Sequence, residues 1–392
     1  MGLVKEAAGA TEEKAPLWTR DFIFLALSNL ILFAGFQMLM PTLPKYVGFL
    51  GGAESVVGLT TGIFTISAVL VRPWVGLELD RRGRRGIYLI GLAVFVISVL
   101  LYSLAPSILA LLIFRLLHGF GWGASTTSAG TIVADILPPQ RRAEGMGYYG
   151  LSANLAMAVA PTLGLYLADT FNFRVVFFAS AALALLATFT ASRIHIPSLV
   201  KHQEELRPAL FEPRAFRPSL VAFFMTLTYG GVVTFLPGYA DSLGIAHAGL
   251  FFSVYAVTLM VIRPVAGIVA DRRGPDIVLI PGLILITVTM VLMSASKNMA
   301  MLLAVAFLYG LAFGSAHPTL QAMTVDGVAP NRRGAANSTF FSAFDLGIGV
   351  GASVLGVISQ FAGYRMMYLA AAGFSLAGLL FYLLSNRRSR ST

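Results

Sequence analysis

Ionisable side chains inside long apolar stretches are the residues of this sequence best suited to chemistry. A charge buried in hydrocarbon is costly, so such a side chain must face a cavity or a partner. Asp345 is the only acid placed well inside an apolar stretch, about 12 residues beyond Arg333. A carboxyl group there can gain and lose a proton, which makes Asp345 the candidate for coupling proton movement to another process. A structural acid, hydrogen-bonded to a neighbouring helix, is the alternative.

Three arginines and two histidines also fall within apolar stretches. Arg115 lies about nine residues into its stretch and is always charged, so it is a candidate for binding an anionic group or for modulating the proton site. Arg72 and Arg263 lie nearer the ends of their stretches, where a long side chain can reach the membrane surface or hold the neighbouring loop. His118 and His317 are candidates for lining a cavity, with a satisfied hydrogen-bonding role as the alternative.

Aromatic and polar residues recur on these stretches in a way that is typical of a small-molecule cavity. Asn29, Phe33 and Phe36 fall on one face of a helix, and Gln37 adds another polar group. Such a cavity is apolar and adaptable, with few fixed polar groups. Packing against lipid or protein is the alternative for any single aromatic residue. The candidate cavity residues are Asn29, Phe33, Phe36, Gln37, Arg115, His118, Trp122, Asn154, Tyr229, Tyr255 and His317.

Twelve apolar stretches are long enough to cross a membrane as helices, at roughly 20 residues each. They run near 22–46, 56–79, 86–105, 107–135, 143–168, 174–193, 218–240, 248–270, 277–296, 299–326, 335–361 and 364–385. Of all residues, 57% are hydrophobic and 12% charged, and the charged fraction is far below that of a water-soluble protein. The composition therefore predicts an all-α polytopic membrane protein.

The basic residues are distributed unevenly. A net charge of +10 first suggests a nucleic-acid partner, but most of the 28 Lys and Arg fall in loops on one side of the expected spans. The opposite side carries Lys45, Arg174, Lys297 and Arg365. This is the positive-inside bias of membrane proteins, and it predicts that both termini are cytoplasmic. The charge therefore reports topology, and we expect no nucleic-acid partner.

One pattern occurs twice, 191 residues apart. The first copy contains Arg72-Pro73, Gly76, Asp80-Arg81-Arg82 and Gly83, and the second contains Arg263-Pro264, Gly267, Asp271-Arg272-Arg273 and Gly274. The same offset relates Asp135 to Asp326, and it places Asn154, which cannot titrate, at the equivalent of Asp345. A repeat that holds one offset over several motifs indicates a duplicated unit. We therefore expect 12 transmembrane helices in two pseudo-symmetric six-helix halves.

The only long polar connection divides the two copies. We expect a cytoplasmic tail at 1–20, a six-helix half at 21–193, a cytoplasmic linker at 194–217, a second half at 218–385 and a cytoplasmic tail at 386–392. Residues 1–20 have no short apolar core, so we expect no signal peptide there. The chain has no Cys and five His, which argues against disulfides and a metal site. We expect no cofactor.

With these motifs the chain resembles the major facilitator superfamily of secondary transporters over essentially its whole length. Gly76-Leu-Glu-Leu-Asp80-Arg-Arg-Gly83-Arg84-Arg85 matches the loop motif of that family, and Arg115 followed by Gly119, Gly121 and Gly123 resembles its fourth-span signature, whose glycines let helices pack closely. The antiporter motif is partial, with Pro161 and Gly164 present and Met157 and Ala160 in place of glycines. The chain resembles the bacterial drug/proton antiporter and small-molecule exporter branch.

The resemblance implies a conformational latch at the loop motif, which in the family stabilises the outward-open state. Gly76 and Gly83 would allow close approach and a tight turn, Asp80 can attract the positive end of a helix, and Arg84 can pair with Asp135. Charges that only set the topology are the alternative. The expected latch residues are Gly76, Asp80, Arg81, Gly83, Arg84, Asp135, Asp271 and Arg272.

The leading hypothesis is a monomeric secondary active transporter of the inner (plasma) membrane that works by alternating access and couples proton entry to efflux of an amphiphilic, drug-like small molecule. A dedicated exporter of a zwitterionic metabolite or metallophore is one alternative. Proton-coupled uptake of a sugar or organic acid is another, because the antiporter glycines are replaced. A membrane enzyme is disfavoured, since the sequence has no paired carboxylates, no His/Asp cluster and no loop domain large enough for a donor substrate.

Overall fold

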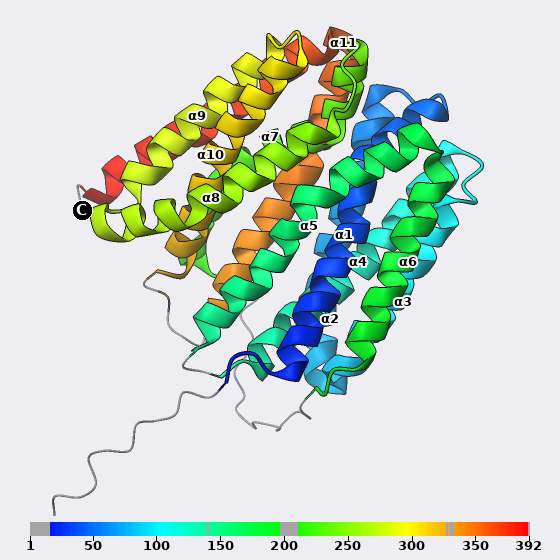
Figure 1. Ribbon diagram of the computed structural model, residues 1–392. Helices are drawn as coiled ribbons and strands as arrows, with labels where there is room; N and C mark the ends of the chain where they lie inside the picture. Colours follow the sequence, from blue (N-terminus) through cyan, green and yellow to red (C-terminus); the bar gives the residue numbers. More distant parts are fainter. Residues whose placement is uncertain (1–15, 139–140, 197–210, 327, 329–332, 391–392) are drawn as a thin grey trace, which may run out of the picture.

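The computed structural model describes residues 16–138, 141–196, 211–326, 328 and 333–390, except for the side chains of residues 77, 80–82, 142–144, 271, 333–334 and 387–390. This described part is almost entirely α-helical (Figure 1), and eleven of its helices are long and apolar enough to cross a membrane. In chain order they are α1 (Arg20–Phe49), α2 (Glu54–Arg82), α3 (Arg84–Tyr102), α4 (Ile108–Ile136), α5 (Arg142–Thr170), α6 (Phe173–Ser192), α7 (Phe216–Ser242), α8 (Gly249–Arg273), α9 (Asp276–Ser294), α10 (Met299–Val325) and α11 (Arg333–Arg390), with the short 3-10 helix η2 (Pro213–Ala215) before α7.

The last element differs from the sequence prediction. The expected stretches 335–361 and 364–385 form one 58-residue element, α11, with non-helical backbone at Gly363 (φ 76°, ψ 169°). A straight helix of that length would measure about 87 Å, nearly three times the hydrocarbon thickness of about 30 Å. Glycine adopts a positive φ without steric cost, and Figure 1 shows the orange and red parts of α11 meeting and then running in different directions.

Local residue chemistry sets where the helices begin and end. The side chains of Ser107, Asn172 and Asn298 accept backbone hydrogen bonds at the starts of α4, α6 and α10, as N-cap residues do. Gly83 (φ 93°) ends α2, and Gly274 (φ 87°) ends α8 at the equivalent position of the repeat. The tight turn expected at Gly83 is therefore confirmed, and the duplicated sequence produces a duplicated turn.

Glycines allow the helices of α4 to pack closely, as predicted. A Cβ on Gly121 would lie 2.5 Å from the backbone nitrogen of Phe95 in α3, and one on Gly123 would lie 2.6 Å from the carbonyl oxygen of Ala68 in α2. Such distances are too short for real atoms, so only glycine fits. The same prediction is wrong for Gly76, because a Cβ there would meet nothing within 4 Å.

The helices form two groups, α1–α6 (the N-terminal group) and α7–α11 (the C-terminal group), which lie side by side in Figure 1. Across the boundary, α2 packs on α11, α5 on α8 and α1 on α7. Because the connections are short, one end of both groups holds Lys45, Gly51 and Gly244; we call it the Lys45 end. The other holds Arg84, Asp135 and Arg273, and we call it the basic end.

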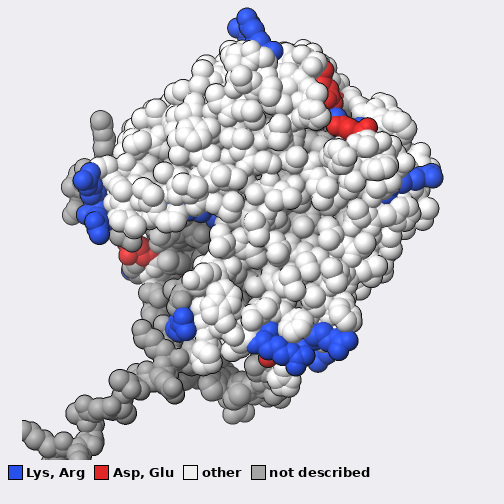
Figure 2. All heavy atoms as spheres, in the orientation of Figure 1, with Lys and Arg blue, Asp and Glu red and all other residues white. Residues whose placement is uncertain are grey.

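The two groups are joined at the Lys45 end. Thr162 of α5 donates to the carbonyl oxygen of Gly249 in α8 (2.7 Å) and lies 2.8 Å from the Ser253 hydroxyl. Figure 1 shows α5 and α8 meeting there and running apart toward their other ends, and Figure 2 shows the surface hollowed between the groups. The conformation is therefore closed at the Lys45 end and open toward the basic end.

The outer surface is suited to lipid. Large apolar side chains are exposed on every one of the eleven helices, among them Leu70 (70% exposed) and Val261 (69%). Figure 2 shows a broad surface without Lys, Arg, Asp or Glu, with charged residues near its margins. A contiguous apolar surface of this size is incompatible with water and fits a bilayer.

We expect that Gly121→Leu destabilises the fold by overpacking the contact between α3 and α4. Forcing extra carbons into a packed core costs about 1–3 kcal/mol or more, so the midpoint of thermal unfolding in detergent should fall and less monodisperse protein should be recovered. Gly130→Leu is the matched control, because a Cβ at Gly130, also in α4, meets nothing within 4 Å. Equal midpoints for the two variants would contradict the close-packing assignment.

Candidate functional site

Asp345 forms an ion pair that joins the two groups. The Arg72 guanidinium of α2 donates to the Asp345 carboxylate of α11 at 2.9 Å, and its other terminal nitrogen donates to the Thr127 hydroxyl of α4 at 3.3 Å. The side chains of Arg72 and Asp345 are 23% and 19% exposed. The pair is therefore held mostly out of water, yet water can still reach it from one side.

This geometry corrects the interpretation of Arg72. The sequence suggested that its side chain reaches the membrane surface or holds the neighbouring loop, but it points to an acid on the other group. Two half-buried charges of opposite sign stabilise each other far more than either could be stabilised alone. Asp345 thus has a neighbouring cation whose charge is fixed, so any proton that binds the carboxylate must compete with Arg72.

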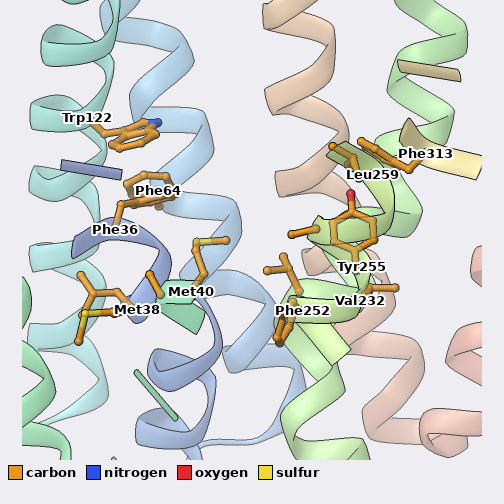
Figure 3. Packing of buried hydrophobic residues seen from close by; sticks show 14 of the residues in the cluster. Phe36, Met38, Met40, Phe64, Trp122, Val232, Phe252, Tyr255, Leu259 and Phe313 are labelled. Carbon is orange, nitrogen blue, oxygen red and sulfur yellow. The ribbon is translucent and has the colours of Figure 1, made fainter. Parts of the chain in front are cut away.

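Aromatic side chains surround the middle of the N-terminal group. Phe36 of α1 stacks on Trp122 of α4 with ring centroids 3.9 Å apart, and Phe64 of α2 lies 5.3 Å from Phe36. Phe33 contacts the other side of Trp122 at 4.8 Å. Figure 3 shows Phe36, Phe64 and Trp122 together, separated from Tyr255 and Phe313 of the C-terminal group. The predicted cavity residues of α1 and α4 are therefore brought together.

Arg115 and His118 lie inside the N-terminal group rather than at an open surface. Arg115 is 2% exposed, its Nε donates to the carbonyl oxygen of Thr60 at 3.0 Å, and its guanidinium lies 4.4 Å from the centre of the Phe64 ring. His118 is fully buried, with Nδ1 2.8 Å from the Tyr102 hydroxyl. These contacts are those of a structural polar cluster, so the alternative role considered for His118 fits its surroundings.

A second aromatic cluster lies in the C-terminal group. Tyr255 of α8 stacks on Tyr309 of α10 at 5.4 Å, and Tyr229 of α7 lies 5.3 Å from Phe313. His317 lies parallel to Phe313 at 5.9 Å. The Tyr229 hydroxyl also reaches the Met157 sulfur of α5 at 3.5 Å, so this cluster touches the N-terminal group.

The predicted polar cavity residues have different surroundings. Asn29 of α1 is satisfied within its own group, donating to the Ser152 hydroxyl at 2.8 Å and accepting from the Tyr149 hydroxyl at 2.9 Å. Gln37 interacts with Tyr229 of the C-terminal group, and Asn154 is half-buried on α5. Gln37 is therefore the polar side chain of α1 at the boundary between the groups.

The Lys45 end carries a second ion-pair system that sequence reasoning did not identify. Lys45 of α1 lies 3.0 Å from the Asp169 carboxylate of α5 and 3.2 Å from the Asp241 carboxylate of α7. Glu54 of α2 accepts a 2.5 Å hydrogen bond from the Tyr364 hydroxyl of α11. Lys45–Asp241 and Glu54–Tyr364 both cross the boundary, so they contribute to the closure at this end.

Some residues of the expected latch are visible at the basic end. The predicted ion pair between Arg84 and Asp135 is present at 3.0 Å, and Arg84 also donates to the carbonyl oxygen of Leu79. Arg272 is exposed. The side chains of Asp80, Arg81 and Asp271 lie outside the described residues. The motif residue Gly164 is needed for packing, because a Cβ there would lie 2.5 Å from the carbonyl oxygen of Met38; Pro161 lies one turn before it in α5.

We expect the energies of Arg72 and Asp345 to be coupled. Arg72→Gln or Asp345→Asn leaves one half-buried group without its partner, so each should lower the thermal unfolding midpoint, whereas the double variant should lose less than the sum by about 1 kcal/mol or more. Thermal unfolding of the purified proteins in detergent measures this. Arg84→Gln combined with Asp345→Asn is the control pair, since these residues do not touch, and its effects should add. Additive effects for Arg72 and Asp345 as well would contradict the coupling.

Comparison with known proteins places this geometry among transporters. The family model described as Major Facilitator Superfamily matches residues 25–246 and 218–392. The multidrug resistance protein MdtG of Enterobacter lignolyticus is 27% identical over 399 residues, which cover 96% of this chain and 95% of that protein.

Solved structures agree on the fold. A bacterial homologue of the human lysosomal transporter Spinster, in an inward-facing and occupied conformation, aligns with a TM-score of 0.79 at 17% identity, covering 93% of this chain and 96% of the other. The nucleoside transporter NupG aligns with a TM-score of 0.77 at 14% identity, covering 93% and 99%. With the family model matching nearly the whole described chain, the protein belongs to the Major Facilitator Superfamily and resembles its drug/proton antiporter branch.

Proposed function

We propose that this transporter exports an amphiphilic, drug-like small molecule in exchange for protons. The observation that carries the proposal is the ion pair between Asp345 and Arg72, which places a titratable carboxylate at the boundary between the two groups. The two aromatic clusters supply apolar surface for an amphiphile. The similarity to a multidrug resistance protein over 96% of the chain favours drug-like substrates and efflux.

The proposal includes a topology. The two parts of α11 on either side of Gly363 would be separate crossings, which completes 12 helices in two six-helix halves, 21–193 and 218–385, joined by the linker 194–217. The basic end would face the cytoplasm, together with both termini (1–20 and 386–392), because basic residues stay on that side of the inner membrane. The described conformation would then be open to the cytoplasm, and a single chain would form the whole pathway.

Proton exchange would use the competition between Arg72 and a proton for Asp345. When the carboxylate is charged, its attraction to Arg72 holds α2 against α11. Protonation removes that attraction and leaves Arg72 without a counter-ion, so the two states of Asp345 favour different positions of the two groups. A substrate and a proton that favour different positions are exchanged one for the other.

We expect Asp345→Asn to abolish proton-driven transport but to retain exchange of substrate for substrate. Asparagine keeps the shape of the side chain and cannot titrate. The measurement uses proteoliposomes with an acidic interior and two dyes, rhodamine 110 and rhodamine 123. Wild type should accumulate at least one of the dyes, a protonophore should prevent this, and Asp345→Asn should fall to the level of empty liposomes while unlabelled dye inside still exchanges for labelled dye outside.

Asp21→Asn, in the first turn of α1, is the control for loss of one carboxylate. Full proton-driven accumulation by Asp345→Asn would reject Asp345 as the coupling group. Accumulation that requires an acidic exterior instead would indicate proton-coupled uptake and would reject efflux.

A disulfide across the Lys45 end should stop transport if that end must open. The chain has no native Cys, and the hydroxyl oxygens of Thr162 and Ser253 are 2.8 Å apart, so Thr162→Cys with Ser253→Cys is placed to form a bond under mild oxidation. We expect transport to fall to background after oxidation and to recover with reductant.

The matched control is Thr287→Cys with Ser375→Cys, whose hydroxyl oxygens are 3.0 Å apart but belong to the same group. This second disulfide should form and leave transport intact. Continued transport by protein fully cross-linked between Cys at positions 162 and 253 would exclude opening of the Lys45 end.

A further inference from the structure

Arg263 is a half-buried cation whose counter-ion the chain does not supply. It is the repeat equivalent of Arg72, but among the described residues no carboxylate forms an ion pair with it, and its buried Nε has no hydrogen-bond partner. Arg72, by contrast, has Asp345 at 2.9 Å. The two equivalent arginines therefore differ in their partners.

The duplicated architecture explains the difference. Arg72 lies on α2, which packs on α11, and the equivalent contact in the repeat is that of α8 on α5. The position on α5 that corresponds to Asp345 is Asn154. An amide is neutral and cannot balance a guanidinium, so the charge of Arg263 remains uncompensated on the protein side.

The Arg263 side chain lies on the inner face of α8. Tyr255, Leu259 and Arg263 follow one another at intervals of four residues, and the first two are 2% and 1% exposed, whereas the lipid face of the helix carries Val261 and Val265, which are 69% and 53% exposed. Arginine side chains in a helix point toward its N-terminus, which here means toward Tyr255. Tyr255 and His317 are both within electrostatic reach of Arg263.

Two unsatisfied donors therefore face one region of the C-terminal group. The buried Tyr255 hydroxyl, like the Arg263 Nε, has no hydrogen-bond partner. Buried polar groups are nearly always paired, and an unpaired charge in a membrane interior is costly. Both costs are relieved by one ligand that brings a negatively charged oxygen to these donors.

We propose that Arg263, assisted by the Tyr255 hydroxyl, binds a carboxylate of the transported molecule. The substrates are then amphiphiles with a carboxylate, zwitterions included, whose apolar part packs on the aromatic cluster of Tyr229, Phe313 and Phe344. Guanidinium suits this task because it stays charged and presents several donors in a plane. The inference rests on the proposed export function and adds the chemical class of its substrate.

The test compares two dyes that differ by one methyl ester. Rhodamine 110 carries a free carboxylate, and rhodamine 123 is its methyl ester. Binding to purified protein in detergent is measured by fluorescence anisotropy, without any proton gradient. Wild type should bind rhodamine 110 more tightly than the ester. Arg263→Gln should weaken rhodamine 110 by about tenfold or more, since a charge-assisted hydrogen bond is lost, and should change the ester by about twofold or less.

The remaining variants separate charge recognition from folding. Arg263→Lys should restore part of the preference for the carboxylate, and Tyr255→Phe should weaken rhodamine 110 alone. Arg365→Gln, an exposed arginine of the same group, should alter neither dye. Equal wild-type affinities, binding of neither dye, or equal losses for both dyes in Arg263→Gln would overturn the proposal.

Two further results are distinguishable. If an anionic phospholipid displaces rhodamine 110 only when Arg263 is present, the site belongs to a lipid headgroup and the proposed substrate class is wrong. If proteoliposomes exchange protons for the ester but the binding preference is absent, proton-coupled export stands and the carboxylate site is rejected.

Discussion

An ionised side chain away from water must have a partner, and this requirement explains where the charged residues of the membrane region lie. Lys45 is placed between Asp169 and Asp241, and Arg72 is placed against Asp345. Each system includes a partner on the other helix group. Charges that face lipid would have no compensation at all, so the boundary between the groups is where such residues can be kept. The interaction between the two groups is therefore electrostatic at both levels, and it is sensitive to protonation wherever a carboxylate takes part.

The duplicated unit has diverged most at its interior. In the N-terminal group, Arg115 and Phe64 pack against each other and His118 is paired with Tyr102, so the polar atoms are largely used within the group. The equivalents in the repeat are Ala306, Tyr255 and Tyr309. Removal of the buried arginine and introduction of hydroxyls leave the C-terminal group with polar atoms that are not committed to packing. One copy of the unit thus resembles a solid support, and the other retains groups available for recognition.

Much of the fold follows from the sequence, and the failures have physical causes. Helix positions were predicted to within about three residues for the first ten, because length and hydropathy determine a membrane span. The pair of Arg84 with Asp135 was predictable because a family motif specifies it. The pair of Arg72 with Asp345 was not, since its members are 273 positions apart and come from different copies of the repeat. Side-chain direction also escaped prediction: Arg115 lies as deep as a binding residue would, yet its helix turns it into the group.

The closure at the Lys45 end is built from small residues, which bears on whether it can open. Backbones of α2 and α11 approach closely at Gly58 and Gly356, and the side chains that bridge the groups include the hydroxyls of Thr61 and Thr234, 3.2 Å apart. A neutral hydrogen bond contributes about 1 kcal/mol net, because water can replace either partner. Separating such an interface exposes little apolar surface per contact, whereas an interface of large apolar side chains would lose roughly 25 cal/mol for every Å² exposed. A closure of this composition is specific in its geometry but weak in each contact, and those are the properties that repeated opening and closing requires.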